Sequence, residues 1–176
     1  MTPGLPRARL AGMVVFVLVS LALIAARLIP VSPGEIPRPG PELMLCLTFA
    51  WVLRRPDQLP APVIVALFVI EDLLLMRPFG LWAALVLLGS EQLRHRSQRW
   101  RDQGFVFEWL RVSALIVLLI LAYRVIMALF LLPVPGLAQV ALQIIATWLA
   151  YPVVVLVARL VLRLRSRSQA EIERLI

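Results

Sequence analysis

Charged side chains inside apolar stretches are the residues most able to do chemistry in this sequence. Glu71 and Asp72 lie beyond the middle of one such stretch, and Arg27 and Arg124 lie at comparable depth in two others. A charge at membrane depth is costly unless it is paired or hydrated. Neighbouring helix residues point about 100° apart, so the two acids cannot share one partner squarely. We expect an ion pair between these acids and Arg27 or Arg124, and Asp72 is the acid whose pairing is singled out for a test. A site that handles a proton or a substrate is the alternative, although no third polar group lies nearby in the sequence.

Polar residues recur every four positions along the last apolar stretch, namely Gln139, Gln143, Thr147 and Tyr151. This spacing places them on one face of a helix, and such side chains hydrogen-bond between helices in lipid. Packing inside a helix bundle is the favoured interpretation. A surface for the transmembrane helix of a partner is the alternative. With Arg54 and Arg55, this polar stripe makes up the candidate partner interface.

Catalytic signatures are absent from the sequence, which has no G-x-S-x-G, no H-E-x-x-H and no Walker A motif. The run from Glu71 through Asp72 to Arg77 partly matches the E-E-x-x-x-R of intramembrane proteases. Its spacing differs by one residue, its second acid differs, and the partner histidines are missing. A single cysteine and a single histidine do not supply a zinc site. We therefore expect no catalytic residue, no metal and no cofactor, in a protein that is not an enzyme.

The composition is that of an integral membrane protein. Of 176 residues, 61% are hydrophobic and 16% are charged, against about 45–50% and about 25% in soluble domains. With so little polar surface, the chain must present most of its exterior to lipid. This excludes a soluble enzyme, a disordered chain and a nucleic-acid-binding domain. The net charge is +8, and all 18 basic residues are arginine. This excess is typical of the basic residues that hold cytoplasmic loops inside.

Six apolar segments predict an all-α bundle of six transmembrane helices in a single domain, residues 1–176. The expected spans are about 10–29, 43–53, 60–76, 79–93, 105–132 and 138–162, and residues 163–176 form a short basic cytoplasmic tail. The first span is about 30 Å long as a helix, which matches the hydrocarbon core of a bilayer. The second is much shorter. It crosses if Arg54 and Arg55 snorkel and the bilayer thins locally.

The distribution of arginines favours six crossings with both termini in the cytoplasm. Twelve loop arginines then lie inside, and two, Arg38 and Arg77, lie outside, as the positive-inside rule requires. The alternative has a re-entrant segment at 43–53, a single bent helix over 60–93, and four crossings. It places Arg54 and Arg55 outside and demands a helix of about 50 Å.

Two stretches carry a family resemblance. Residues 41–56 contain P-E-L near their start and W-V-L-R-R-P at their end, and Asp72 is followed by Pro78 and Gly80. These resemble the P-D-L…W-x-x-R-R-P and D…P-L-G elements of the rod shape-determining protein MreD family. The length, the short second span and the basic loop before the fifth span are also similar. Glu42 instead of aspartate, the extra acid Glu71 and Met76 instead of a small residue depart from that pattern, which puts in doubt any family role in helix packing there.

The resemblance implies a multi-pass scaffold in the bacterial inner membrane that belongs to the cell-elongation machinery and maintains rod shape. It implies binding to the bitopic protein MreC and a link between actin-like MreB filaments and peptidoglycan synthases. It also implies a fold similar to the substrate-binding subunits of energy-coupling-factor vitamin transporters. A vitamin-binding subunit is therefore the alternative function. Few hydrogen-bonding side chains are expected on the extracytoplasmic side, which favours the scaffold over a vitamin-binding subunit. The scaffold would also contact membrane lipids, and no nucleic acid is expected as a partner.

Overall fold

Helices form the whole of the regular structure in the described residues, which are 5–29, 40–100, 105–134 and 136–172 of the computed structural model. The elements are α1 (Leu5–Leu28), α2 (Leu43–Arg54), the short 3-10 helix η1 (Pro56–Gln58), α3 (Ala61–Leu74), α4 (Leu81–Trp100), α5 (Phe105–Leu129) and α6 (Leu137–Ile172). Each α-helix corresponds to one of the six predicted segments. The main differences are that α4 continues beyond residue 93 to Trp100, into the polar stretch expected to separate the spans, and that α6 continues beyond residue 162 into the expected tail.

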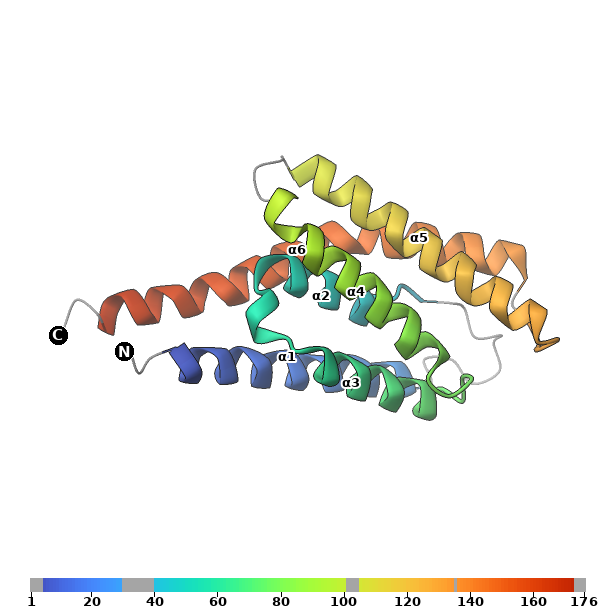
Figure 1. Ribbon diagram of the computed structural model, residues 1–176, viewed down its shortest axis with the longest axis horizontal. Coiled ribbons are helices and arrows are strands. Elements are labelled where there is room, and N and C mark those ends of the chain that lie inside the picture. The colour runs from blue at the N-terminus through green and yellow to red at the C-terminus, as the bar shows by residue number, and fades with distance from the viewer. Residues whose placement is uncertain (1–4, 30–39, 101–104, 135, 173–176) are drawn as a thin grey trace.

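Successive helices run back and forth along one direction. The start of α1 and the end of α6 lie at the same end of the bundle (Figure 1). We call this the proximal end. The opposite, distal end holds the end of α1, the start of α2, the α3–α4 turn and the end of α5. Residues that are far apart in the sequence therefore meet at each end.

Three helices are long and apolar enough to cross a membrane by length and composition. They are the segments Arg9–Leu28 of α1, Phe105–Leu129 of α5 and Leu137–Leu160 of α6. Large apolar side chains along all three are exposed, among them Leu18, Leu118 and Leu156. An apolar exterior of this extent is typical of a protein that sits in lipid.

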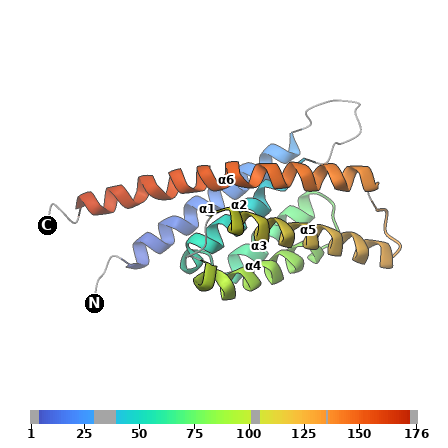
Figure 2. The same cartoon turned by 90° about the horizontal axis from the view of Figure 1, so that it is seen from above.

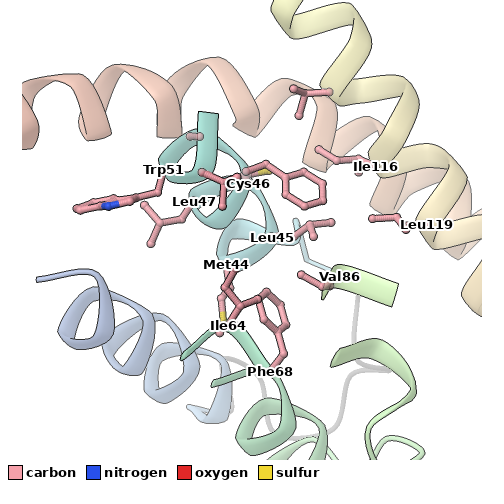
Figure 3. Packing of buried hydrophobic residues seen from close by; sticks show 14 of the residues in the cluster. Met44, Leu45, Cys46, Leu47, Trp51, Ile64, Phe68, Val86, Ile116 and Leu119 are labelled. Atoms are coloured by element: carbon pink, nitrogen blue, oxygen red, sulfur yellow. The ribbon is translucent and has the colours of Figure 1, made fainter. Parts of the chain in front are cut away.

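The short helix α2 lies at the centre of the bundle, with ten consecutive buried residues from Met44 to Leu53. It packs against α4 and α6 and also contacts α1, and α6 lies along it in the second view (Figure 2). In the close-up, residues of α3, α4 and α5, such as Phe68, Val86 and Ile116, surround its side chains (Figure 3). A 12-residue helix is only about 18 Å long. Because α2 is enclosed by longer helices, its length does not have to match the bilayer.

The enclosure of α2 corrects the expectation that Arg54 snorkels to the membrane surface. Nη1 of Arg54 donates to the carbonyl of Ala50 at 3.0 Å, and Nη2 donates to Oε1 of Glu108 at 2.9 Å. The side chain therefore points back along α2 and across to α5. Arg55, the next residue, is exposed.

Helices α3 and α5 end in the same backbone arrangement at the distal end. The N–H of Arg77 donates to the carbonyl of Asp72 at 2.9 Å. The N–H of Leu132 donates to the carbonyl of Met127 at 3.0 Å. In both cases the residue after a left-handed position donates its N–H to a carbonyl in the last turn of the helix. This hydrogen bond is the mark of a Schellman motif.

The left-handed positions of both motifs carry large apolar residues. Met76 has φ 51° and Leu131 has φ 55°, where glycine is the usual residue because it has no Cβ. The steric cost of this conformation for an L-residue is about 1–2 kcal/mol. Both side chains are almost completely exposed, at 95% for Met76 and 94% for Leu131.

Candidate functional site

Four charged side chains and one amide from distant parts of the sequence meet at the distal end. We call them the distal charge cluster: Arg27, Glu42, Glu71, Arg77 and Gln143. The two carboxylates are buried and the two guanidinium groups are about one-fifth exposed. Two cations oppose two anions, so the cluster offsets the cost of removing each charge from water.

Glu42 is the centre of this cluster. Its Oε1 accepts hydrogen bonds from Nη2 of Arg77 at 3.0 Å and from Nε2 of Gln143 at 2.8 Å. Its Oε2 lies 2.9 Å from Nη2 of Arg27. Glu42 directly precedes α2, so this one carboxylate joins α1, the start of α2, the α3–α4 turn and α6.

The charge state of Glu42 follows from its neighbours. Guanidinium groups lie within 3.0 Å of both its oxygens, and opposite charges at this distance favour the ionised form of a carboxyl group. Glu42 is therefore the anion shared by two ion pairs. An ionised group in this position holds both arginines by charge as well as by hydrogen bonds.

The backbone at the start of α2 is also satisfied from α6. The N–H of Glu42 donates to Oγ1 of Thr147 at 3.1 Å, and the Thr147 hydroxyl donates to the carbonyl of Gln143 at 2.7 Å. A helix begins with N–H groups that have no partner inside the helix. Away from water, such groups need partners from other elements. The α6 side chains supply one of them here.

Arg27 attaches α1 to the rest of the cluster. Its Nη1 donates to Oε1 of Glu71 at 3.0 Å, and its Nη2 donates to the carbonyl of Pro41 at 2.7 Å. The same Nη2 faces Glu42. The guanidinium group thus holds α1 to the last turn of α3 and to the entry of α2.

The expected ion pair between an acid of α3 and Arg27 is present, and Glu71 forms it. The expectation that Asp72 itself pairs with Arg27 is wrong, because Arg27 is bound to Glu71 and Glu42. Oδ2 of Asp72 instead accepts the backbone N–H of Ala83 at 3.3 Å, in the first turn of α4. The two adjacent acids point about 100° apart on α3. Glu71 therefore faces α1 while Asp72 faces the start of α4, where a carboxylate also suits the helix dipole.

The other predicted residues of this region lie around the α3–α4 turn and on α5. The carbonyl of Pro78 accepts the N–H of Leu81 at 3.2 Å, and Gly80 has φ 76°, a conformation that glycine adopts without strain. Arg124, the other expected partner of Asp72, lies half-exposed on α5. The turn shapes the cluster by placing Arg77 beside Glu42.

Three of the four residues of the polar stripe on α6 bind groups inside the bundle, as the favoured interpretation predicted, and Gln139 instead makes a local contact at the start of α6. Thr147 and Tyr151 are fully buried, and the Tyr151 hydroxyl donates to Oε1 of Glu108 at 3.2 Å. Gln143 binds Glu42, and Oε1 of Gln139 accepts the N–H of Gly136 at 3.3 Å. The alternative, in which the stripe is a partner surface, is corrected because its buried members already bind groups inside the bundle.

A second ionic contact holds the proximal end. Oε1 of Glu108 accepts from both Arg54 and Tyr151, which ties α2, α5 and α6 together. Of the six residues that sequence analysis assigned to a partner interface, Arg55 alone is classed as exposed in the structure.

Sequence reasoning missed the roles of Glu42 and Arg77. Glu42 was noted only as a departure from a motif, and Arg77 only as a loop arginine and as part of an incomplete protease motif. The available signal was the alternation of the helices, which brings the end of each odd-numbered helix to the start of the next even-numbered helix. This places Arg27, Glu42, Glu71 and Arg77 at one end, with balanced charge.

The cluster is suited to holding helices together. Each Glu42 oxygen lies within 3.0 Å of a guanidinium nitrogen. Over the described ranges, no group of three or more His, Cys, Asp or Glu side chains is placed to hold a metal ion. Comparisons of the chain with protein-family models, curated proteins and solved structures find no match. The function is therefore argued from this geometry and from the sequence.

We expect Glu42→Gln to destabilise the protein strongly. The substitution keeps the size of the side chain but leaves Arg27 and Arg77 without their shared anion, and breaking a buried ion pair costs about 3–5 kcal/mol. The midpoint of thermal unfolding in detergent, followed by tryptophan fluorescence, measures the effect.

The matched control for this substitution is Glu91→Gln. Glu91 pairs with Arg94 at 3.3 Å in a more exposed i,i+3 contact, and such pairs contribute about 0–1 kcal/mol. Adding Arg77→Gln to Glu42→Gln is expected to restore part of the lost stability. An unchanged midpoint for Glu42→Gln contradicts the central role of this carboxylate.

For Asp72 we expect Asp72→Asn to fold almost normally and Asp72→Leu to lower the folded yield. Asparagine still accepts the N–H of Ala83, whereas loss of a helix cap costs about 0.5–2 kcal/mol. Because Asp72 does not bind Arg27, adding Arg27→Leu to Asp72→Leu brings no recovery. Fluorescence-detected size-exclusion chromatography of tagged variants measures the folded amount. Recovery in the double variant means instead that Asp72 pairs with Arg27.

Proposed function

We propose that this protein is a non-enzymatic, multi-pass scaffold of the bacterial inner membrane, similar to the MreD family. In this proposal it binds an MreC-like bitopic protein. It thereby couples MreB filaments to peptidoglycan synthases and maintains rod shape. The six helices cross the membrane, and both termini lie in the cytoplasm.

The observation that carries this proposal is the meeting of both motif stretches at one end of the bundle. Glu42, from the first stretch, binds Arg77, which lies between Asp72 and Pro78 of the second. Asp72 in turn binds the backbone at the start of α4. Motif residues that build one interlocked structural unit are what a rigid scaffold requires, because the unit fixes the relative positions of α1 to α4 and α6.

The arrangement of the helices supports six crossings. The α-helices alternate in direction, so the start of α1 and the end of α6 lie together at the proximal end (Figure 1). The enclosure of α2 removes the main objection to a short crossing helix, since longer helices cover its surface. With the positive-inside rule, the arginine-rich proximal end becomes the cytoplasmic end.

The polar side chains inside the bundle are already bound to other helices, which supports a binding role over turnover of a substrate. Glu42, Glu71, Glu108 and Tyr151 all hold other helices. A transmembrane partner then meets an apolar surface, on which close packing supplies the association. A scaffold of this kind needs stable helix positions and no open catalytic set.

For the topology, we expect cysteine-labelling to place Arg55 and Gly40 on opposite sides. Both positions are exposed, and they lie at the proximal and distal ends. In a Cys46→Ser background, Gly40→Cys is expected to react with an impermeant maleimide on intact spheroplasts, and Arg55→Cys only after permeabilisation. Labelling of Arg55→Cys from the outside alone supports the four-crossing alternative and contradicts six crossings.

For the function, we expect depletion of the protein in its native host to convert rod-shaped cells into round ones. A tagged copy purified from native membranes should bring down an MreC-like bitopic protein, identified by mass spectrometry. An unrelated six-helix protein with the same tag is the control. Normal cell shape after depletion together with no recovered bitopic partner contradicts the scaffold. Recovery of a bound vitamin instead favours the transporter subunit.

A further inference from the structure

Large hydrophobic side chains are exposed at two places at the distal end, the α3–α4 turn and the junction of α5 and α6. In the α3–α4 turn, Met76 and Phe79 are 95% and 74% exposed. At the end of α5, Phe130 and Leu131 are exposed, and so is Leu137 at the start of α6. We call these five residues the distal tips. Exposed apolar groups that gather at two turns of the same end of the bundle are out of place in water.

The backbone conformation at Met76 and Leu131 is a second unusual feature of the distal tips. Met76 and Leu131 occupy the left-handed positions of two Schellman motifs, where glycine is favoured. The neighbouring Gly80 shows that this chain uses glycine for a positive φ nearby. At Met76 and Leu131 the chain instead carries a large apolar side chain that makes little contact with the protein. Such a side chain contributes to the folded state only if an apolar phase surrounds it.

The length of α5 identifies that phase. Arg111 is exposed near the start of α5, and the 20 residues from there to Leu131 span about 30 Å, the thickness of the hydrocarbon core. Exposed apolar side chains follow α5 through Leu118 and Val125 to the tip, and the half-exposed Arg124 is the charged residue among them. From residue 125 to residue 138 the sequence has no polar side chain.

We propose that the distal tips insert into the acyl-chain region of the bilayer and act as lipid anchors. They hold the distal end of the bundle below the level of the lipid head groups. The arginines of the distal charge cluster then lie at the boundary of the hydrocarbon core, and their carboxylate partners lie beneath it. This inference needs only that the protein sits in a membrane, and it does not rest on the proposed partner or on cell shape.

The favoured occupant is lipid because the tips at the end of α5 and the start of α6 continue the apolar exterior of these helices, and Leu131 lies about one hydrocarbon thickness from Arg111. A protein that covered the same residues would have to compete with that continuous lipid surface. Docking of a protein on the tips is therefore treated as an outcome of the test.

The test measures depth in the full-length protein. Single substitutions Leu131→Cys and Phe79→Cys, each in a Cys46→Ser background, are labelled with the fluorophore NBD and placed in nanodiscs of phosphatidylcholine and phosphatidylglycerol. Arg55→Cys, at an exposed position of the proximal end, is the matched control. Quenching is compared between lipids that carry a nitroxide on the acyl chain and iodide in the buffer.

We expect both tip positions to be quenched several-fold more strongly by the acyl-chain nitroxide than by iodide, with the reverse order at Arg55→Cys. Stronger quenching by iodide at both tips overturns the proposal, because the tips then lie in water. Iodide quenching that disappears only when native membrane proteins are added also overturns it and assigns the tips to a protein partner. If Leu131→Cys does not fold, Phe130→Cys reports on the same turn.

Discussion

The carboxylate of Glu42 is the interaction on which the arrangement of the helices depends. It is almost completely buried, and it lies within 3.0 Å of two guanidinium groups that come from α1 and from the α3–α4 turn. Gln143 adds a hydrogen bond from α6. A buried carboxylate is tolerated only with partners of this kind. The requirement to surround one anion therefore fixes where four parts of the chain end or begin.

This constraint explains how a helix as short as α2 fits in the bundle. Its first residues are held by Glu42 and Thr147 at the distal end, and Arg54 closes its last turn against Glu108 at the proximal end. Between these contacts, every side chain from Met44 to Leu53 is buried. The polar ends of the helix are satisfied by protein groups, so neither end has to reach the lipid head groups.

The sequence predicted the number and order of the helices well, because the apolar runs, including the short second one, are separated by prolines, glycines or arginines. It also predicted that the α6 stripe shares one face. It could not predict the partners, since Glu71 and Asp72 are adjacent and a rotation of about 100° decides which of them meets Arg27. That rotation is set by contacts with α1 and α4. Glu42 was missed because its partners come from three distant parts of the chain, namely α1, the α3–α4 turn and α6.

The attachment of α1 has a consequence for the order of synthesis. Arg27 is made before Glu42 and Glu71, the two acids that bind it. When helices insert one after another, α1 carries an uncompensated guanidinium group until α2 and α3 have followed it. Its other contacts, with α2, η1 and α3, likewise come from later parts of the chain. In the proposed six-crossing arrangement, the first of these six helices to be made is therefore among the last of them to reach its final position, and the insertion machinery shelters its charge until then.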